Sequence, residues 1–397
     1  MDLNQTPSAN RVHIAFFGVR NAGKSSVMNA VTGQNIAIVS DVKGTTTDPV
    51  FKAMELLPLG PVTIIDTPGL DDTGDLGKMR IEKTLQILRK TNIAVLVVDA
   101  MQGLSEFDQN ILNLFAKQQI PHIIVYNKID LVPNLTDKLN SQPNSICVSA
   151  QTGEGIHQLK EKLAHLNQAK QEKYILKDII KPKDNVVLVI PIDKAAPKGR
   201  LILPQQQVIR ELLDIGATAI MTQDTNLENT LNNLKQKPAL VITDSQAFAK
   251  VNKIVPKDIE LTSFSILFSR YKGNLTRQVQ AAKILDTIKT GDKILIAEGC
   301  THHRQCDDIG TVKLPNWIRK YTQAEPKFEF TSGTQFPTDL SPYKLIIHCG
   351  GCMLNEREMQ YRLKTATEQH IPMSNYGTAI AYMNGILKRT LHIFNLQ

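Results

Sequence analysis

Four of the chain's five cysteines lie in two short stretches whose residue types are those of a metal site. The first stretch reads Gly-Cys-Thr-His-His-Arg-Gln-Cys at residues 299–306, and the second reads Ile-Ile-His-Cys-Gly-Gly-Cys at residues 346–352. Two glycines separate Cys349 from Cys352, so the backbone can turn sharply and direct both thiolates to one metal centre. Cys300 can join them if the strands that precede the two stretches are neighbours in a sheet.

Three kinds of site fit this spacing. Zinc prefers four firm ligands, which three thiolates and one imidazole from His302, His303 or His348 would supply. A [4Fe–4S] cluster also needs a set of thiolates, but it can leave one iron to an exchangeable ligand that is not cysteine. Cys349 and Cys352 could instead work as a redox dithiol. The spacing alone therefore leaves the cluster, the zinc site and the dithiol open.

The N-terminal part of the chain carries a different kind of motif, a phosphate-binding loop. Residues 18–26 read Gly-Val-Arg-Asn-Ala-Gly-Lys-Ser-Ser, which matches G-x-x-x-x-G-K-[ST] between an expected strand and an expected helix. Backbone N–H groups of such a loop and the following helix N terminus bind anions. Lys24 is expected to reach the outer phosphates, and the Ser25 hydroxyl to bind Mg²⁺. The residues that we expect around the nucleotide here are Gly18, Asn21, Ala22, Gly23, Lys24, Ser25 and Ser26.

Two later segments could bind Mg²⁺ and sense the γ-phosphate. Asp66-Thr-Pro-Gly69 follows an apolar run, which lets Asp66 hold Mg²⁺ through water and lets the Gly69 N–H contact the γ-phosphate. Residues 43–48, Lys-Gly-Thr-Thr-Thr-Asp, offer threonines for Mg²⁺ between the phosphate loop and Asp66.

The base contacts are expected from two further strand ends. In Asn127-Lys-Ile-Asp130, the Asp130 carboxylate can accept two hydrogen bonds from N1 and N2 of guanine, which adenine cannot supply. Asn127 can bond to the base, and the stem of Lys128 can stack on its plane. Ser149-Ala150 would place a backbone N–H near guanine O6. The order and spacing of all these motifs indicate GTP binding rather than ATP binding.

The elements that must position these groups are those of an α/β protein. Apolar runs starting at residues 12, 62, 92, 121 and 145 alternate with helical periods, which predicts a mostly parallel, doubly wound sheet with its ligands at the carboxyl ends of the strands. The same alternation continues to the C terminus. We expect three domains: a nucleotide-binding domain at residues 1–167, a middle α/β domain at 172–261 and a C-terminal α/β domain at 262–397.

Bulk composition limits the partners and the compartment. Apolar residues make up 42% of the 397 residues, which is sufficient for real cores, and the net charge is +8. No long basic run or RNA-binding signature accompanies that charge, so nucleic acid is not the expected partner. The start is polar and the apolar runs are strand-length, so we expect a cytoplasmic protein with no membrane partner. Cys147 is expected in the core, and Cys306 in a loop.

The N-terminal motifs resemble a Ras-like GTPase of the Era/TrmE type. The resemblance implies that a threonine at 45–47, most simply Thr46, ligates Mg²⁺. Leu70 stands where Ras-type enzymes carry a glutamine that orients water, so intrinsic hydrolysis is expected to be slow. Asn21 matches an asparagine that, in potassium-stimulated relatives, helps to hold K⁺ against the phosphates.

The whole chain resembles the HydF family of [FeFe]-hydrogenase maturation GTPases, on the combination of C-x-H, about 45 residues later H-C-x-x-C, and a preceding GTPase domain. The resemblance implies a Ras-like P-loop GTPase domain, a middle dimerisation domain and a C-terminal domain that binds a [4Fe–4S] cluster. In that family the three motif cysteines hold the cluster, which here means Cys300, Cys349 and Cys352. The fourth iron is labile. Its candidate ligands are His302 and His348, with His303, Glu298, Asp307 and Asp308 as weaker ones.

The family's role implies the partners. A homodimer would receive a transient di-iron precursor made with radical-SAM maturation enzymes and deliver it to the [FeFe]-hydrogenase apoprotein. An RNA- or ribosome-assembly GTPase with a zinc or iron–sulfur module is the main alternative, and a redox-sensing GTPase with a Cys349–Cys352 dithiol is a second one.

Overall fold

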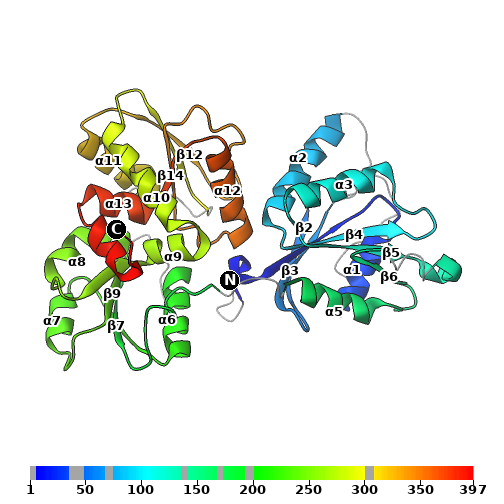
Figure 1. Cartoon of the computed structure of the whole chain (residues 1–397), viewed down its shortest axis with the longest axis horizontal. Coiled ribbons are helices and arrows are strands. Elements are labelled where there is room, and N and C mark those ends of the chain that lie inside the picture. The colour runs from blue at the N-terminus through cyan, green and yellow to red at the C-terminus, as the bar shows by residue number, and fades with distance from the viewer. Residues whose placement is uncertain are drawn as a thin grey trace. The chain divides into compact units, whose positions relative to one another are not determined.

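The computed structural model describes residues 6–34, 49–67, 75–135, 142–167, 173–192, 201–299 and 308–396. The chain divides into two compact units, residues 1–171 and 172–397 (Figure 1). Both units are built from parallel or mostly parallel sheets with helices against them, so the expected α/β class is confirmed. None of the helices within these residues is long and apolar enough to cross a bilayer.

The first unit has a six-stranded sheet in the order β2-β3-β1-β4-β5-β6. All neighbouring strands are parallel except β2 and β3, which are antiparallel. Its strands are β1 (Val12–Phe17), β2 (Val50–Leu56), β3 (Gly60–Asp66), β4 (Ile93–Asp99), β5 (His122–Asn127) and β6 (Ser145–Cys147). Its helices are α1 (Lys24–Thr32), α2 (Asp75–Lys90), α3 (Glu106–Lys117) and α5 (Ile156–Asn167), with 3-10 turns at Ser8–Asn10, Ile129–Leu131 and Pro133–Leu135.

Helices cover both faces of this sheet, which is why its central strands are continuous apolar runs. In β4 every residue is buried. Side chains alternate between faces along a strand, so Phe16 packs with α1 and α5, whereas Phe17 packs with α2 and α3. In Figure 1, α1 and α5 lie on one side of the sheet and α2 and α3 on the other. The carboxyl ends of β1, β3, β4 and β5 are thereby left to the connecting loops that carry the predicted motifs.

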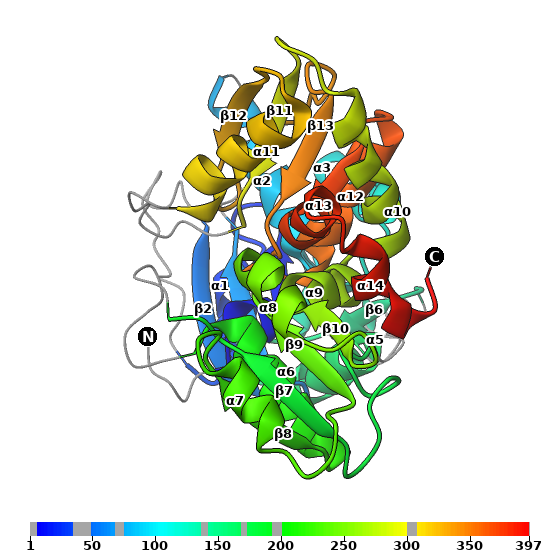
Figure 2. The same ribbon diagram turned by 90° about the vertical axis from the view of Figure 1, so that its left-hand side faces the viewer.

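The second unit contains two four-stranded parallel sheets, in the orders β10-β9-β7-β8 and β12-β11-β13-β14 (Figure 2). The strands are β7 (Asn185–Val189), β8 (Thr218–Thr222), β9 (Leu240–Thr243), β10 (Glu260–Ser263), β11 (Lys293–Ala297), β12 (Lys327–Thr331), β13 (Leu345–His348) and β14 (Met373–Asn375). The helices are α6 (Leu203–Ile215), α7 (Leu227–Asn232), α8 (Phe248–Ile254), α9 (Phe264–Lys272), α10 (Leu275–Ala282), α11 (Leu314–Thr322), α12 (Glu356–Glu368), α13 (Tyr376–Met383) and α14 (Leu387–Leu391).

Helix α9 belongs to the cores of both sheets. Its Leu267 and Phe268 pack with residues of β7 and β9, whereas its Ile266 packs with residues of β11 and β13. We call the sheet β10-β9-β7-β8 the middle sheet. The expected boundary between residues 261 and 262 falls inside its strand β10, which continues to Ser263. The middle core therefore extends beyond the predicted limit, and the division of the chain into three domains stays a prediction.

Candidate nucleotide and metal sites

The phosphate loop joins β1 to α1, and α1 begins at the motif lysine, Lys24. Gly23 has a φ of +84°, and a Cβ there would lie 2.2 Å from Nδ2 of Asn127. A Cβ at Gly18 would lie 2.4 Å from the carbonyl oxygen of Val97. Both positions therefore require glycine, because the loop packs closely on β4 and on the end of β5. The loop leads directly into the N terminus of α1, which is a favourable place for an anion.

Lys24 and Asp66 meet at the carboxyl ends of neighbouring strands. Phe16 of β1 is paired in register with Asp66 of β3, and the Lys24 ammonium forms an ion pair with the Asp66 carboxylate. Thr67 is buried and donates from Oγ1 to the carbonyl oxygen of Phe16 over 2.6 Å, which fixes the end of β3 against β1. The two side chains that were predicted to meet the phosphates and Mg²⁺ thus lie together at the strand ends, and the half-buried Ser25 lies in the first turn of α1.

The Asn127 side chain connects three nucleotide motifs. Its Nδ2 donates to the carbonyl oxygen of Ala22 over 3.1 Å, and its Oδ1 accepts from the backbone N–H of Ala150 over 3.1 Å. An amide has two N–H groups and two oxygen lone pairs, so each end keeps capacity for a base contact. Asn127 is 2% exposed, which makes this link part of the packed interior.

Lys128 is held over the phosphate loop by two acceptors. Its ammonium donates to the carbonyl oxygen of Asn21 over 2.7 Å and pairs with Asp99 over 2.7 Å. The buried Asp99 also accepts from the backbone N–H of Met101 over 2.9 Å. Asp99 was not predicted as a site residue. Its position at the end of the apolar run that forms β4, where ligands of such sheets bind, could have indicated it.

The remaining base-directed residues lie as follows. Asp130 is exposed in the 3-10 turn after β5, where its carboxylate can meet a base edge. The Ser149 N–H is donated to the carbonyl oxygen of Glu154 over 3.0 Å. Since Ala150 donates to Asn127, a contact of Ala150 with guanine O6 would have to share or replace that bond. Thr46, Gly69 and Leu70 lie outside the described residues.

The two cysteine stretches follow neighbouring strands. Strand β11 is parallel to β13, with Ala297 paired to His348, so the condition for bringing the stretches together is met. Beyond the strands, the backbone N–H of Gly299 donates to Sγ of Cys349 over 3.0 Å, and the N–H of Gly351 donates to the same sulfur over 3.4 Å. The residue that immediately precedes Cys300 therefore contacts the second stretch.

We use the name cysteine loop for residues 349–354, between β13 and α12. Gly351 has a φ of +63°, and a Cβ there would lie 2.6 Å from Sδ of Met359. A Cβ at Gly299 would lie 2.8 Å from Cγ of Leu354. The left-handed backbone of Gly351 favours glycine there, in agreement with the sharp turn predicted between the cysteines, and Gly299 packs closely on the Leu354 side chain.

Lys272, the last residue of α9, extends under the cysteine loop. It is 3% exposed, and its ammonium donates to the carbonyl oxygens of Leu354, Cys352 and Gly351 over 2.9, 3.3 and 3.4 Å. Burial lowers the pKa of Lys272 to about 8, against the opposing effect of the neighbouring cysteine sulfurs. Lys272 was not predicted from the sequence, because it lies about 80 positions before the loop, in a helix that contains no recognised motif.

His348 lies beside the first loop cysteine but is engaged elsewhere. It is fully buried, its Nε2 is 2.9 Å from Nη1 of Arg362, and its Nδ1 is 2.7 Å from the carbonyl oxygen of Cys349. A guanidinium only donates, so Nε2 accepts and Nδ1 carries the proton that it donates to Cys349. Burial and the Arg362 charge lower the pKa of His348 to about 3. With both ring nitrogens in use, this arrangement disfavours His348 as a metal ligand.

The two loop thiols are free and half-buried. Burial, followed by the nearby Cys352, raises the pKa of Cys349 to about 11. Burial also raises the pKa of Cys352, and Lys272 opposes that effect. Cys300, His302, His303, Cys306 and Asp307 lie outside the described residues. Among the residues that are described, no three cysteine, histidine or acidic side chains gather into a metal site.

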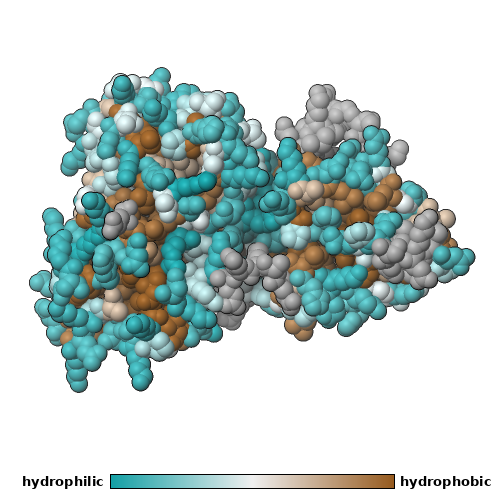
Figure 3. All heavy atoms as spheres, in the orientation of Figure 1, coloured by the Kyte–Doolittle hydropathy of each residue, from teal (hydrophilic) through white to brown (hydrophobic). Residues whose placement is uncertain are grey.

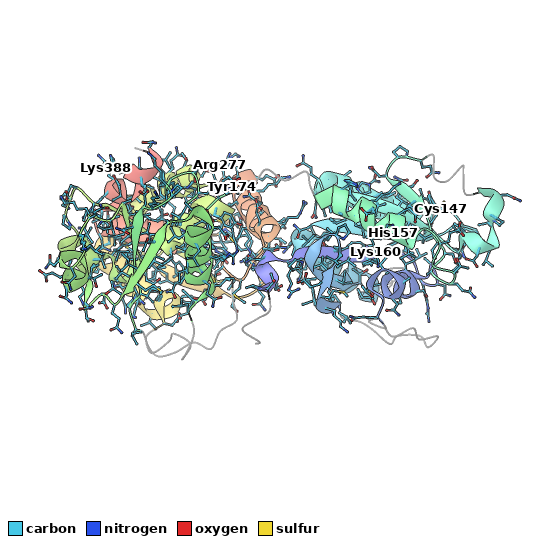
Figure 4. The ribbon with its side chains drawn as sticks, turned by 90° about the horizontal axis from the view of Figure 1, so that it is seen from below. Cys147, His157, Lys160, Tyr174, Arg277 and Lys388 are labelled. Atoms are coloured by element: carbon cyan, nitrogen blue, oxygen red, sulfur yellow. The ribbon has the colours of Figure 1, made fainter. Side chains whose placement is uncertain are left out.

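Two acidic residues that were weaker ligand candidates have structural contacts. Tyr376 Oη donates to Oε1 of the buried Glu298 over 3.3 Å. Asp308 accepts from the backbone N–H of Thr311 over 2.8 Å and from its hydroxyl over 2.9 Å, so it caps the following turn. Cys147, labelled in Figure 4, is buried in β6 with the core around Phe115, as predicted.

Family models match nearly the whole chain. One described as the hydrogen maturase F tetramerization domain matches residues 276–393, and one described as the hydrogen maturase F dimerization domain matches residues 175–273. A third, described as a 50S ribosome-binding GTPase, matches residues 13–128.

Individual relatives resemble the N-terminal unit. The tRNA modification GTPase MnmE of Chromobacterium violaceum is 38% identical over 157 residues, which is 39% of this chain and 34% of that protein. MnmE of Carboxydothermus hydrogenoformans is 37% identical over 164 residues, with 39% and 34% covered. The chain thus spans about a third of the length of these curated relatives. The crystal structure of a probable GTP-binding protein engB has a TM-score of 0.33 and 22% identity, over 40% of this chain and all of that one.

Proposed function

Because the chain belongs to the hydrogen maturase F family, we propose that it is a GTPase scaffold that carries a [4Fe–4S] cluster, receives a di-iron precursor and delivers it to [FeFe]-hydrogenase apoprotein. The observation that carries the proposal is the 3.0 Å hydrogen bond from the N–H of Gly299 to Sγ of Cys349. It supports a single centre held by Cys300, Cys349 and Cys352, because it brings the backbone before Cys300 onto the cysteine loop.

The donor set fits an anionic iron–sulfur group. Thiolates are the protein ligands of such clusters, and hydrogen bonds to the sulfurs stabilise their negative charge. Cys349 has two such bonds, from Gly299 and Gly351. A cluster with three cysteine ligands keeps one iron for an exchangeable ligand, which is where a second iron unit would be bridged. Of the histidine candidates, His302 stays a proposal, whereas the contacts of His348 favour a supporting role.

GTP hydrolysis is the proposed chemistry of the N-terminal unit. The triphosphate would lie on the loop with Lys24 at its outer phosphates, and Mg²⁺ would be bound by Ser25 and Thr46, with Asp66 acting through water. The Gly69 N–H would contact the γ-phosphate. Asn21 would hold K⁺ against the phosphates, so turnover is expected to be faster in potassium than in sodium. An Asn21→Ala variant with unchanged potassium stimulation would contradict that assignment.

The middle sheet supports a homodimer. Strand β8 is an edge strand of this sheet, and its Met221 is 56% exposed. Leu213 on the adjacent helix α6 is 63% exposed. In Figure 3, apolar residues form a band among polar ones on the face of the second unit, residues 172–397, that is turned to the viewer. An exposed sheet edge with apolar side chains suits pairing with a second chain.

The nucleotide cycle would control the partners. The segments after the phosphate loop and around Asp66 would order around γ-phosphate and Mg²⁺ and relax after hydrolysis. That change would alter the affinity for the radical-SAM maturation enzymes or the hydrogenase apoprotein. Equal affinities and off-rates for these partners in the GTP and GDP forms would contradict this role. A tRNA-directed role finds less support, since the MnmE likeness covers 39% of the chain and leaves the cysteine stretches out.

Anaerobic reconstitution tests the cluster. We expect iron and sulfide to be retained by the wild type and lost in Cys300→Ala, Cys349→Ala and Cys352→Ala, with GTP turnover unchanged. Cys147→Ala is the matched control, because that thiol is buried in the nucleotide-binding unit. Lys24→Ala should abolish nucleotide binding and leave the EPR signal intact. A colourless protein that retains zinc, or a metal-free protein with a reversible Cys349–Cys352 disulfide, would contradict the proposal.

A further inference from the structure

A buried positive charge without a carboxylate partner lies directly under the cysteine loop. Lys272 is 3% exposed. Across the described parts of the chain, its ammonium forms no ion pair within 4.0 Å. Glu356, the acidic residue at the start of α12, is paired instead with Lys173 over 2.6 Å. An ammonium removed from water without a counter-charge is strongly disfavoured in a protein interior.

The groups around Lys272 compensate only part of that charge. Three backbone carbonyls accept its hydrogen bonds, from Leu354, Cys352 and Gly351. Lys272 also ends α9, where the helix dipole favours a cation. Carbonyls and dipoles supply partial charges, whereas thiolates and an iron–sulfur group supply full ones. All three acceptors belong to the loop that contains both cysteines.

We propose that the Lys272 ammonium is the counter-charge of the anionic iron–sulfur group on the cysteine loop, and that it positions this loop through its carbonyls. This inference rests on the proposed function. A positive charge close to the cluster stabilises the more negative, reduced state, so Lys272 raises the reduction potential. Lys272 is a positioning residue, because its ammonium donates to the carbonyl oxygens of the cysteine loop.

Three substitutions separate charge from anchoring. Lys272→Met keeps the apolar stem and removes both the charge and the donors. Lys272→Gln removes the charge but keeps a donor for the carbonyl of Leu354 or Cys352. Lys272→Arg keeps both. Lys293→Met is the control, because it removes a lysine from the sheet that carries the cysteine loop. Lys293 lies on β11, its side chain is 43% exposed, and it is paired to Glu329.

The proteins are reconstituted anaerobically with iron and sulfide and titrated for their reduction potential by EPR. We expect Lys272→Met and Lys272→Gln to shift the potential to more negative values, and Lys272→Arg and Lys293→Met to leave it near the wild type. Iron loss to a chelator should be faster in the two neutral variants by about 10–100-fold, the usual effect of removing a group that supports metal ligands.

The outcomes distinguish the two proposals. If the wild type retains no iron and sulfide, the proposed function fails, and this inference fails with it. If the wild type is loaded and the neutral variants match it in potential and chelator resistance, the counter-charge role alone is overturned. Circular dichroism of the apoproteins controls for folding. If neither neutral variant folds while Lys272→Arg does, Lys272 has only a structural role and the inference is likewise overturned.

Discussion

Arg362 donates a hydrogen bond from Nη1 to Nε2 of His348 over 2.9 Å, and this contact fixes the tautomer of the imidazole. Nδ1 must then carry the proton, and it donates to the carbonyl oxygen of Cys349 over 2.7 Å. Arg362 also donates to Glu358 over 2.9 Å and to the carbonyl oxygen of Gly333 over 2.7 Å. Through Arg362 and His348, hydrogen bonds therefore connect helix α12 and the loop at Gly333 to Cys349, the first residue of the cysteine loop.

Removing Arg362 should be strongly destabilising. The Arg362 and Glu358 side chains are 0% and 4% exposed, so Arg362→Ala leaves a carboxylate buried and unpaired. We expect a loss of about 3–5 kcal/mol in the free energy of unfolding, measured by urea denaturation of the apoprotein. Arg319→Ala is the control, because its pair with Glu325 is exposed and should contribute about 1 kcal/mol or less. Similar losses in both variants would contradict a buried network.

His348 should support the cysteine loop without binding metal. We expect His348→Ala to lower the thermal midpoint of the apoprotein, because it removes the acceptor of a buried guanidinium and the donor to Cys349. The EPR spectrum of the reconstituted cluster should keep its g values. His348→Gln, which can keep one of the two bonds, should recover part of the stability. Altered g values in both variants would show that the imidazole is a cluster ligand.

Gly23 should tolerate no side chain. An alanine Cβ would lie 2.2 Å from Nδ2 of Asn127, on a backbone with a φ of +84°. Since Asn127 also contacts Ala22 and Ala150, Gly23→Ala should disturb the phosphate loop and both base motifs, and a fluorescent GDP analogue should lose at least about tenfold in affinity. Gly33→Ala isolates the backbone strain, because Gly33 has a φ of +66° and nothing within 4 Å of its Cβ. Equal binding by the two variants would refute the clash.

The strands and the motifs at their ends could be predicted from the sequence, because each depends on residues that are adjacent in the chain. The apolar runs at β1, β3, β4, β5 and β6 are buried strands, and the loop after β1 has the required glycines. Lys272 and Arg362 could not be found in this way. Arg362 lies in the charged helix α12 and reads as a solvent-exposed residue, and only the tertiary packing buries it against His348. The domain limit predicted at residue 261 falls inside β10, a four-residue strand whose last residue, Ser263, caps helix α9.

Cys147 should behave as a core residue. It is 4% exposed on β6, and burial raises the pKa of its thiol. We expect Cys147→Ser to lower the free energy of unfolding by about 1–3 kcal/mol, because it buries a hydroxyl in an apolar cluster, and Cys147→Ala to cost less. In the folded full chain, mass spectrometry should find Cys147 unmodified by iodoacetamide, with full modification in urea. Rapid modification of the folded protein would contradict the packing of β6.

Asp130 should decide which base is bound. Its exposed carboxylate follows β5, where it can accept hydrogen bonds from N1 and N2 of guanine. Asp130→Asn replaces an acceptor by an amide donor, so the affinity for GTP should fall about a hundredfold or more. Xanthine has an oxygen in place of the guanine 2-amino group, so the same variant should gain affinity for xanthosine triphosphate. Competition against a fluorescent nucleotide measures both changes.

Asp99→Asn is the comparison, because it weakens the support of Lys128 and leaves the donors and acceptors that face the base unaltered. It should therefore lower the affinity for both nucleotides alike. An Asp130→Asn protein that still prefers GTP over xanthosine triphosphate would remove Asp130 from the base site.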